Sequence, residues 1–218
     1  MGRSGNRPPF FFVTPIGYRR RVDRLDALRL DEDGAERRSG AALSVLGFLH
    51  AEVERLPPDR PGVRLDSLPQ LMPLLEASGP IGQIAARILG DGARPVRTIL
   101  FDKSPATNWR LGWHQDRTIA VRRRHAVPGF GPWTVKAGIA HVAPPFDLLT
   151  AMITLRVHLD RVPEGNAPLR IAPGSHRRFV REMRSTRALR HAACAPAWPR
   201  LATSGSIGLR SCMRLTPW

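Results

Sequence analysis

Two side chains that commonly bind metal ions lie two positions apart in the segment Trp113-His114-Gln115-Asp116. On a β-strand, residues i and i+2 point to the same side, so His114 and Asp116 can face one cavity while Gln115 turns away. An imidazole and a carboxylate, joined by a second imidazole from a distant strand, form the facial set of ligands that holds non-haem Fe(II). A single His-x-Asp also occurs by chance in many proteins, so the surrounding elements must decide between these interpretations.

The first part of the chain shows large apolar residues at helical spacing. The stretches 46–56, 68–75 and 81–88 repeat such residues at intervals of three and four, and Gly90 follows the last of them. We therefore expect three short helices before the strands begin.

After Gly90 the pattern changes to short β-type runs. Residues 95–101 and 117–121 predict short strands, and 151–162 is the clearest strand of the chain. A turn at 163–168 then predicts a hairpin whose second strand is 169–172. The clearest strand has an apolar face (Ile153, Leu155, Val157 and Leu159) and a polar face (Thr154, Arg156, His158 and Asp160). Helices followed by strands indicate an α+β fold.

Composition limits the class of protein. A chain of 218 residues with 42% hydrophobic and 24% charged residues fits one soluble domain. No apolar run reaches the roughly 18 residues of a membrane span, and no signal peptide is recognisable, so we expect a cytoplasmic protein. The net charge of +16 comes mostly from scattered arginines, which is more typical of a GC-rich genome than of nucleic-acid binding. Cys194 and Cys212 do not form a disulfide framework.

Residues 95–178 resemble the phytanoyl-CoA dioxygenase family, with a looser match across the preceding helices. Two motifs carry the resemblance: Trp113-His114-Gln115-Asp116, and Asn166-Ala167-Pro168-Leu169 leading into Pro173-Gly174-Ser175-His176. The fold of that family is a double-stranded β-helix, a cupin-like jelly roll. The resemblance therefore implies one domain over 1–218, with a helical part at about 34–90 and a jelly-roll part at about 95–182.

The resemblance also implies a reaction. Fe(II) would be held by His114, Asp116 and a later His, with 2-oxoglutarate and O₂ as co-substrates. Oxidative decarboxylation of 2-oxoglutarate to succinate would drive hydroxylation of a small organic substrate. The implied partners are small molecules, with neither nucleic acid nor a membrane among them, and the sequence predicts no oligomeric state.

Four further residues are candidates for binding. Asn108 and Lys103 precede the metal motif and either contact 2-oxoglutarate or substrate, or are a strand-end residue and a surface residue. Trp133 resembles a pocket wall of the family, although large aromatic residues are more often core. His158 lies on the polar face of its strand, which faces either solvent or the lumen of a barrel.

Two other histidines have structural interpretations. His176 closes a Pro-Gly-Ser-His turn, in which proline and glycine shape the bend. His141 is expected in a loop.

The end of the chain departs from the family pattern. The family has a late metal His on a strand that begins Gly-Asp, followed by an Arg for the 2-oxoglutarate carboxylate. Neither is recognisable here, His191 is the only late histidine, and no Asp or Glu follows Glu182. A shift of one base lets residues 201–214 spell the missing strand and its His. We interpret the tail from about Cys194 as an out-of-frame read that packs poorly and leaves the jelly roll incomplete.

Three hypotheses follow in order. The first is an Fe(II)/2-oxoglutarate-dependent dioxygenase, impaired in this copy by loss of the late His and the Arg. The alternative is a non-catalytic jelly-roll binding protein that uses the same cavity without iron. The third is a basic protein associated with nucleic acid, for which the net charge is the only indication.

Overall fold

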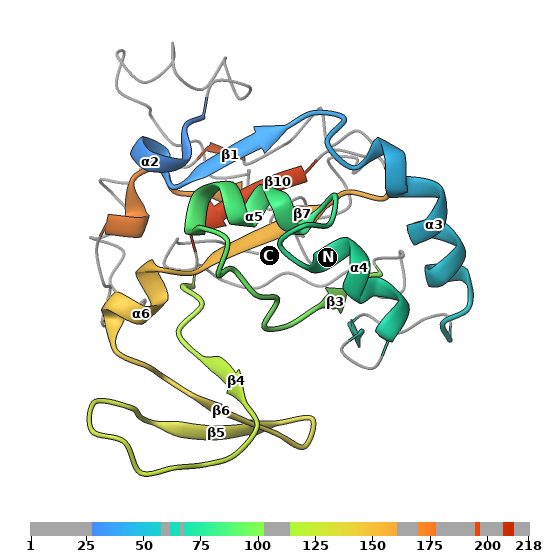
Figure 1. Ribbon diagram of the computed structural model, residues 1–218. Helices are drawn as coiled ribbons and strands as arrows, with labels where there is room; N and C mark the ends of the chain where they lie inside the picture. The colour runs from blue at the N-terminus through green and yellow to red at the C-terminus, as the bar shows by residue number, and fades with distance from the viewer. Residues whose placement is uncertain are drawn as a thin grey trace, which may run out of the picture.

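The computed structural model describes residues 28–57, 62–65, 68–102, 114–160, 170–177, 195–196 and 207–211 (Figure 1). Several residues and segments singled out in the sequence lie outside these ranges, namely Lys103, Asn108, Trp113, residues 166–169, His191, Cys194 and Cys212.

Helices dominate the first part of the described chain. They are α2 (Leu30–Asp33), α3 (Leu43–Glu54), α4 (Met72–Leu75) and α5 (Gly82–Leu89), followed later by α6 (Phe146–Thr150), with 3₁₀ turns η2 (Pro69–Leu71) and η3 (Ser175–Arg177). The three predicted helices are confirmed as α3, as η2 with α4, and as α5. Gly90 ends α5 with a φ of 88°, a backbone angle that favours glycine.

The described strands pair antiparallel throughout. One sheet has the order β1 (Ala35–Arg38), β10 (Ile207–Ser211), β7 (Ile153–Val157), and another has the order β4 (Ile119–Val121), β6 (Ile139–Val142), β5 (Trp133–Lys136). Two further pairs are β2 (Val63–Arg64) with β3 (Ile99–Leu100), and β8 (Arg170–Ile171) with β9 (Ala195–Pro196). This mixture of helices and antiparallel sheets confirms the α+β class, and the complete jelly roll stays a prediction.

The hydrophobic core lies between the helices and one face of the β1-β10-β7 sheet. Ile207 on β10 is fully buried and packs with Ala42, Val45, Ile81 and Ile84, which come from the start of α3 and from α5 and its N-terminus. The apolar side chains Leu155 and Val157 of β7 join the same cluster. The alternation predicted over 151–162 is confirmed for Leu155 and Val157, which pack toward the helices, whereas the strand itself is shorter and ends at Val157.

The predicted partner of β7 is wrong. β7 pairs with β10, and β8 pairs with β9, so the two strands expected to form one hairpin belong to different sheets. His141 is also misplaced by the sequence pattern, because it lies within β6 and its side chain is fully buried. The local turn between β5 and β6 contains Ala137 and Gly138, both with positive φ, and creates a hairpin that hydrophobic alternation did not reveal.

The tail contributes a central strand. Ile207–Ser211 form β10, which pairs with β1 on one side and with β7 on the other. This differs from the expectation of a poorly packed tail at these residues. The reason is long-range pairing, since both strands beside β10 lie far from it in sequence.

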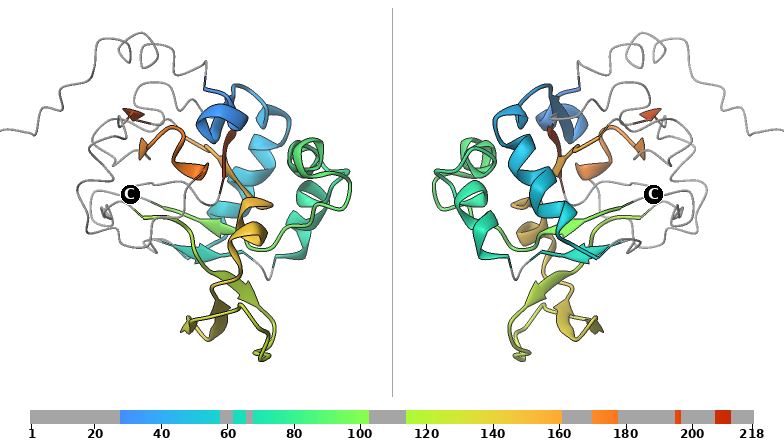
Figure 2. Two further views of the ribbon diagram at one scale, coloured as in Figure 1. Left: turned by 90° about the vertical axis from the view of Figure 1, so that its left-hand side faces the viewer. Right: turned by 90° about the vertical axis from the view of Figure 1, so that its right-hand side faces the viewer.

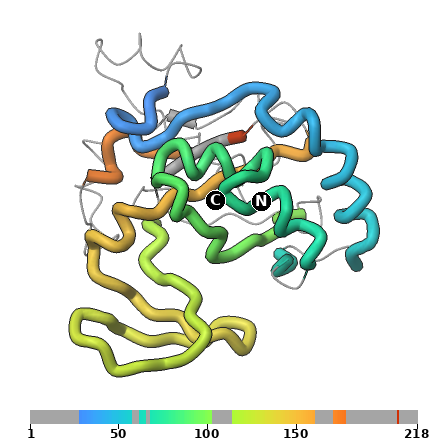
Figure 3. The backbone as a smooth tube through the Cα atoms, viewed as in Figure 1, coloured from blue at the N-terminus to red at the C-terminus, as the bar shows by residue number. Residues whose placement is uncertain are grey.

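The sheet β4-β6-β5 stands apart from this body. Figures 1 and 2 show these strands extending away from the helices and from the β1-β10-β7 sheet. The backbone trace leaves the body through β4 and returns from β6 through α6 to β7 (Figure 3). We call residues 119–142 the arm. Among the described residues, no helix is long and apolar enough to cross a membrane.

Candidate functional site

The metal motif lies in the segment that leads into β4. His114 and Asp116 are each half-buried, while Gln115 between them is only 6% exposed. Gln115, which was expected to turn away from the cavity, is the most buried of the three, so burial does not place His114 and Asp116 in one cavity. The assignment of these two residues as metal ligands stays a prediction.

A third protein ligand is not present in the described part of the chain. Among the described residues, no group of three His, Cys, Asp or Glu side chains lies close enough to hold one metal ion. The described residues therefore offer His114 and Asp116 as donors, an imidazole and a carboxylate, and the facial set for Fe(II) is incomplete there.

A second cluster of polar groups lies on the sheet face that is turned away from the helices. Arg37 on β1 and Arg156 on β7 are both register partners of Gly208 on β10, so they lie on the same face with a glycine between them. His158 comes directly after β7, and the charges of both Arg156 and Arg37 act on its imidazole. We use the name polar face for the sheet face that carries Arg37 and Arg156, together with the neighbouring His158.

His158 is strongly affected by this environment. Its side chain is 8% exposed, so the solvent-facing alternative from the sequence is wrong. Burial, together with the smaller effects of the positive charges of Arg156 and Arg37, lowers the pKa of His158 to about 4. At neutral pH the imidazole is therefore neutral, the form that can accept a hydrogen bond or donate a lone pair to a metal.

Arg156 is also positioned by an aromatic ring. Its guanidinium lies 5.7 Å from the ring centroid of Phe101, which follows β3. A cation over an aromatic face is held by the ring quadrupole. This contact ties the polar face to the end of β3, just before the residues that precede the metal motif.

Trp133 lies on the arm. It begins β5, pairs with Val142 of β6, and is half-buried. The guanidinium of Arg124 lies 5.4 Å from the Trp133 ring centroid. The role of Trp133 as a pocket wall stays a prediction. The ring contact described here is with Arg124, which lies on the arm like Trp133 itself.

His176 has the structural role expected of it. Its Nε2 lies 3.2 Å from the backbone oxygen of Asp31, and Arg177 Nη2 donates to the same oxygen at 3.0 Å. The backbone N–H of Gly174 donates to the oxygen of Asp33. These bonds attach the Pro-Gly-Ser-His turn to α2.

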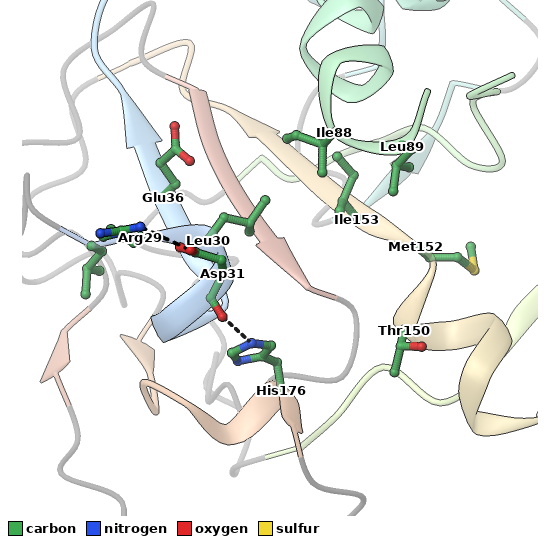
Figure 4. A pocket seen from close by; sticks show the side chains of 11 residues that line it. Arg29, Leu30, Asp31, Glu36, Ile88, Leu89, Thr150, Met152, Ile153 and His176 are labelled. Atoms are coloured by element: carbon green, nitrogen blue, oxygen red, sulfur yellow. Dashed lines mark hydrogen bonds and ion pairs between the residues drawn. The ribbon is translucent and has the colours of Figure 1, made fainter. Parts of the chain in front are cut away.

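An open pocket of about 660 Å³ lies beside this turn (Figure 4). Ile88, Leu89 and Ile153 form part of its apolar wall, and Asp31 and His176 belong to its polar wall. The sequence did not predict this pocket, because its lining comes from segments that are distant in the chain and show no shared motif.

Comparison with known proteins identifies the fold. No family model matches the chain, and no curated protein matches it. The non-heme alpha ketoglutarate dependent epimerase SnoN from nogalamycin biosynthesis aligns with a TM-score of 0.56 and 15% identity, over 91% of this chain and 76% of SnoN. EctD from S. alaskensis, solved with 2-oxoglutarate and 5-hydroxyectoine, aligns with a TM-score of 0.57 and 18% identity, over 91% of this chain and 68% of EctD. The chain shares its overall fold with SnoN and EctD.

A third solved structure with a similar arrangement is AviO1 from Streptomyces viridochromogenes Tue57. It aligns with a TM-score of 0.51 and 14% identity, over 94% of this chain and 88% of AviO1. The sequence analysis did not predict that Arg37 and Arg156 lie on the same face of one sheet. Arg156 had a signal, since it lies on the polar face of a predicted strand. Arg37 had none, because β1 reads Ala-Glu-Arg-Arg.

Proposed function

We propose that the chain derives from an Fe(II)/2-oxoglutarate-dependent oxygenase of the phytanoyl-CoA dioxygenase type that acts on a small organic substrate. The observation that carries the proposal is the shared fold, together with a half-buried His-x-Asp motif at the start of β4. SnoN and EctD are a 2-oxoglutarate-dependent epimerase and a protein solved with 2-oxoglutarate, which supports the same co-substrate here.

The residues have separate roles in this proposal. His114 and Asp116 bind Fe(II), which with 2-oxoglutarate and O₂ supplies the oxidation of a C–H bond. Arg37 and Arg156 give the polar face a positive potential that suits a carboxylate, in place of the late Arg that the sequence lacks. His158 stays neutral beside them and offers a hydrogen bond without adding charge.

The proposal includes an impaired metal site. A facial set needs three protein donors, and only His114 and Asp116 of such a set are found among the described residues. We therefore expect weak Fe(II) binding and no succinate formation by the 218-residue chain.

The test uses the full chain under anaerobic conditions. Fe(II) binding is measured by calorimetry, and succinate is then measured after addition of 2-oxoglutarate and O₂. Weak, saturable binding without succinate supports the proposal. Rapid succinate formation would contradict the impairment and would mean that another residue supplies the third donor. Complete lack of Fe(II) binding would contradict the metal assignment.

The incomplete donor set also favours a second candidate. A non-catalytic binding protein with this fold would keep the polar face and need no metal. It predicts that a small dicarboxylate such as succinate binds the metal-free chain and that Fe(II) leaves this affinity unchanged. The oxygenase proposal predicts instead that Fe(II) strengthens binding of 2-oxoglutarate, which chelates the metal.

A further inference from the structure

The arm carries positive charge without any negative partner of its own. Residues 117–146 contain no Asp or Glu, whereas Arg122, Arg123, Arg124 and Lys136 all lie on the arm and are exposed. Within the described part of the chain, none of these four cations forms an ion pair with a carboxylate. Four like charges on so short a projection repel each other, and an acidic surface would relieve that repulsion.

Apolar side chains accompany these charges. Val135 on the edge strand β5 is 72% exposed, and Val127 in the preceding loop is 47% exposed. Val135 follows Trp133 by two residues, so both lie toward the same face of the arm. Exposed apolar side chains accompanied by exposed charged side chains are a combination found at protein-docking surfaces.

We propose that the arm docks an acidic protein surface, with Val135 as the apolar centre of the contact and the exposed Arg122, Arg123 and Lys136 supplying positive charge near it. The arm extends away from the body, so a partner can reach it without displacing the helices (Figures 1 and 2). Because β4 follows the metal motif by a few residues, the partner is held on the element that leads from His114 and Asp116.

Nucleic acid and a second copy of the chain fit less well. Sequence-tolerant binding of single strands relies on aromatic rings that stack on bases, but the Trp133 ring already has Arg124 over it. Valine offers no comparable contact to a base. A second copy would bring an identical basic arm and a net charge of +16 toward the first, so like charges would meet.

The experiment compares two variants with equal loss of charge. The arm variant is Arg122→Gln with Arg123→Gln and Lys136→Gln. The control variant is Arg87→Gln with Arg94→Gln and Arg97→Gln, which removes the same three charges from exposed residues on α5 and the following segment. The probe is a fluorescent acidic amphipathic helix built from Glu, Ala and Leu, titrated with the full chain at low and at physiological salt. Double-stranded DNA and phosphatidylserine vesicles are titrated in parallel.

We expect the arm variant to bind the acidic helix about tenfold more weakly and the control variant to change by less than about twofold, with the difference reduced by salt. Val135→Ser, which removes only the apolar centre, weakens helix binding about threefold or more and leaves DNA binding unchanged. Unaltered thermal melting shows that each variant is folded. Equal weakening by the two charge variants would overturn the proposal, as would arm-dependent binding of DNA or vesicles without arm-dependent binding of the acidic helix.

Discussion

Arg37 and Arg156 lie on the same face of the β1-β10-β7 sheet, on either side of Gly208, with which both are in register. His158, two residues beyond Arg156, is buried, and burial together with the charges of Arg156 and Arg37 lowers the pKa of its imidazole. This arrangement makes the stability of the protein depend on pH in a specific window.

The pKa of His158 predicts that stability falls as pH drops from about 6.5 to about 4. In this window the unfolded chain binds a proton at His158 and the folded chain does not, so acid favours unfolding. The loss reaches about 3 kcal/mol at the acid end. Urea unfolding of His158→Gln against the unmodified chain, at pH 7 and pH 5, measures it. The variant should lose this part of the pH dependence, and His125→Gln, at an exposed histidine, should keep it.

Replacement of Ile207 by alanine tests the central place of β10. Ile207 is fully buried among Ala42, Val45, Ile81 and Ile84, so Ile207→Ala should lower the free energy of unfolding by about 2–5 kcal/mol. Val135→Ala, at a side chain that is 72% exposed, is the control and should change it by less than about 0.5 kcal/mol. A value for Ile207→Ala as small as the control would show that the tail does not pack in the core.

Two glycines on neighbouring helices should respond oppositely to alanine. A Cβ at Gly82 would collide with the backbone oxygens of Glu76 and Leu75, so Gly82→Ala should destabilise the chain by about 3 kcal/mol. Gly47 lies within α3 with nothing within 4 Å of a Cβ, so Gly47→Ala should stabilise by about 0.5–1 kcal/mol. Thermal melting separates the two, and destabilisation by Gly47→Ala would contradict the packing described for α3.

Removal of either candidate metal donor should weaken Fe(II) binding further. Both His114→Ala and Asp116→Ala should lower the affinity by at least about 10–100-fold, the range known for changes to groups that only support a ligand. His125→Ala removes an exposed histidine and should leave the affinity unchanged. Anaerobic calorimetry gives the comparison. Equal affinity in all three variants would assign Fe(II) to other residues.

Local patterns predicted the elements whose partners are close in sequence or whose periodicity is strong. The helices α3 and α5 and the strand β7 follow directly from apolar spacing, because each buries one continuous apolar face. β1 could not be found in this way, since Glu36, Arg37 and Arg38 leave no apolar alternation. The segment is a strand because it pairs with β10, and no local sequence pattern specifies that pairing.

The residues of the candidate site also differ in whether local sequence alone reveals them. His114 and Asp116 were recognisable because two ligand types at one spacing have chemical meaning before any fold is known. The neighbourhood of His158 was not recognisable, because Arg37 reaches it only through two strand pairings. His141 was assigned to a loop because the turn at Ala137 and Gly138 is too tight to show in alternation, although it places His141 in a buried strand.

The central position of β10 has a consequence for synthesis of the chain. During translation β1 is synthesised early and β7 much later. Neither strand can pair with β10 until Ile207–Ser211 have been synthesised. Between the synthesis of β7 and that of β10, the nascent polypeptide therefore holds two strands that lack β10 between them and an unfilled position in the core beside Ile81 and Ile84. Such a nascent chain exposes strand edges that can pair with other chains until β10 is synthesised, and a codon change that slows elongation before residue 207 prolongs that exposure.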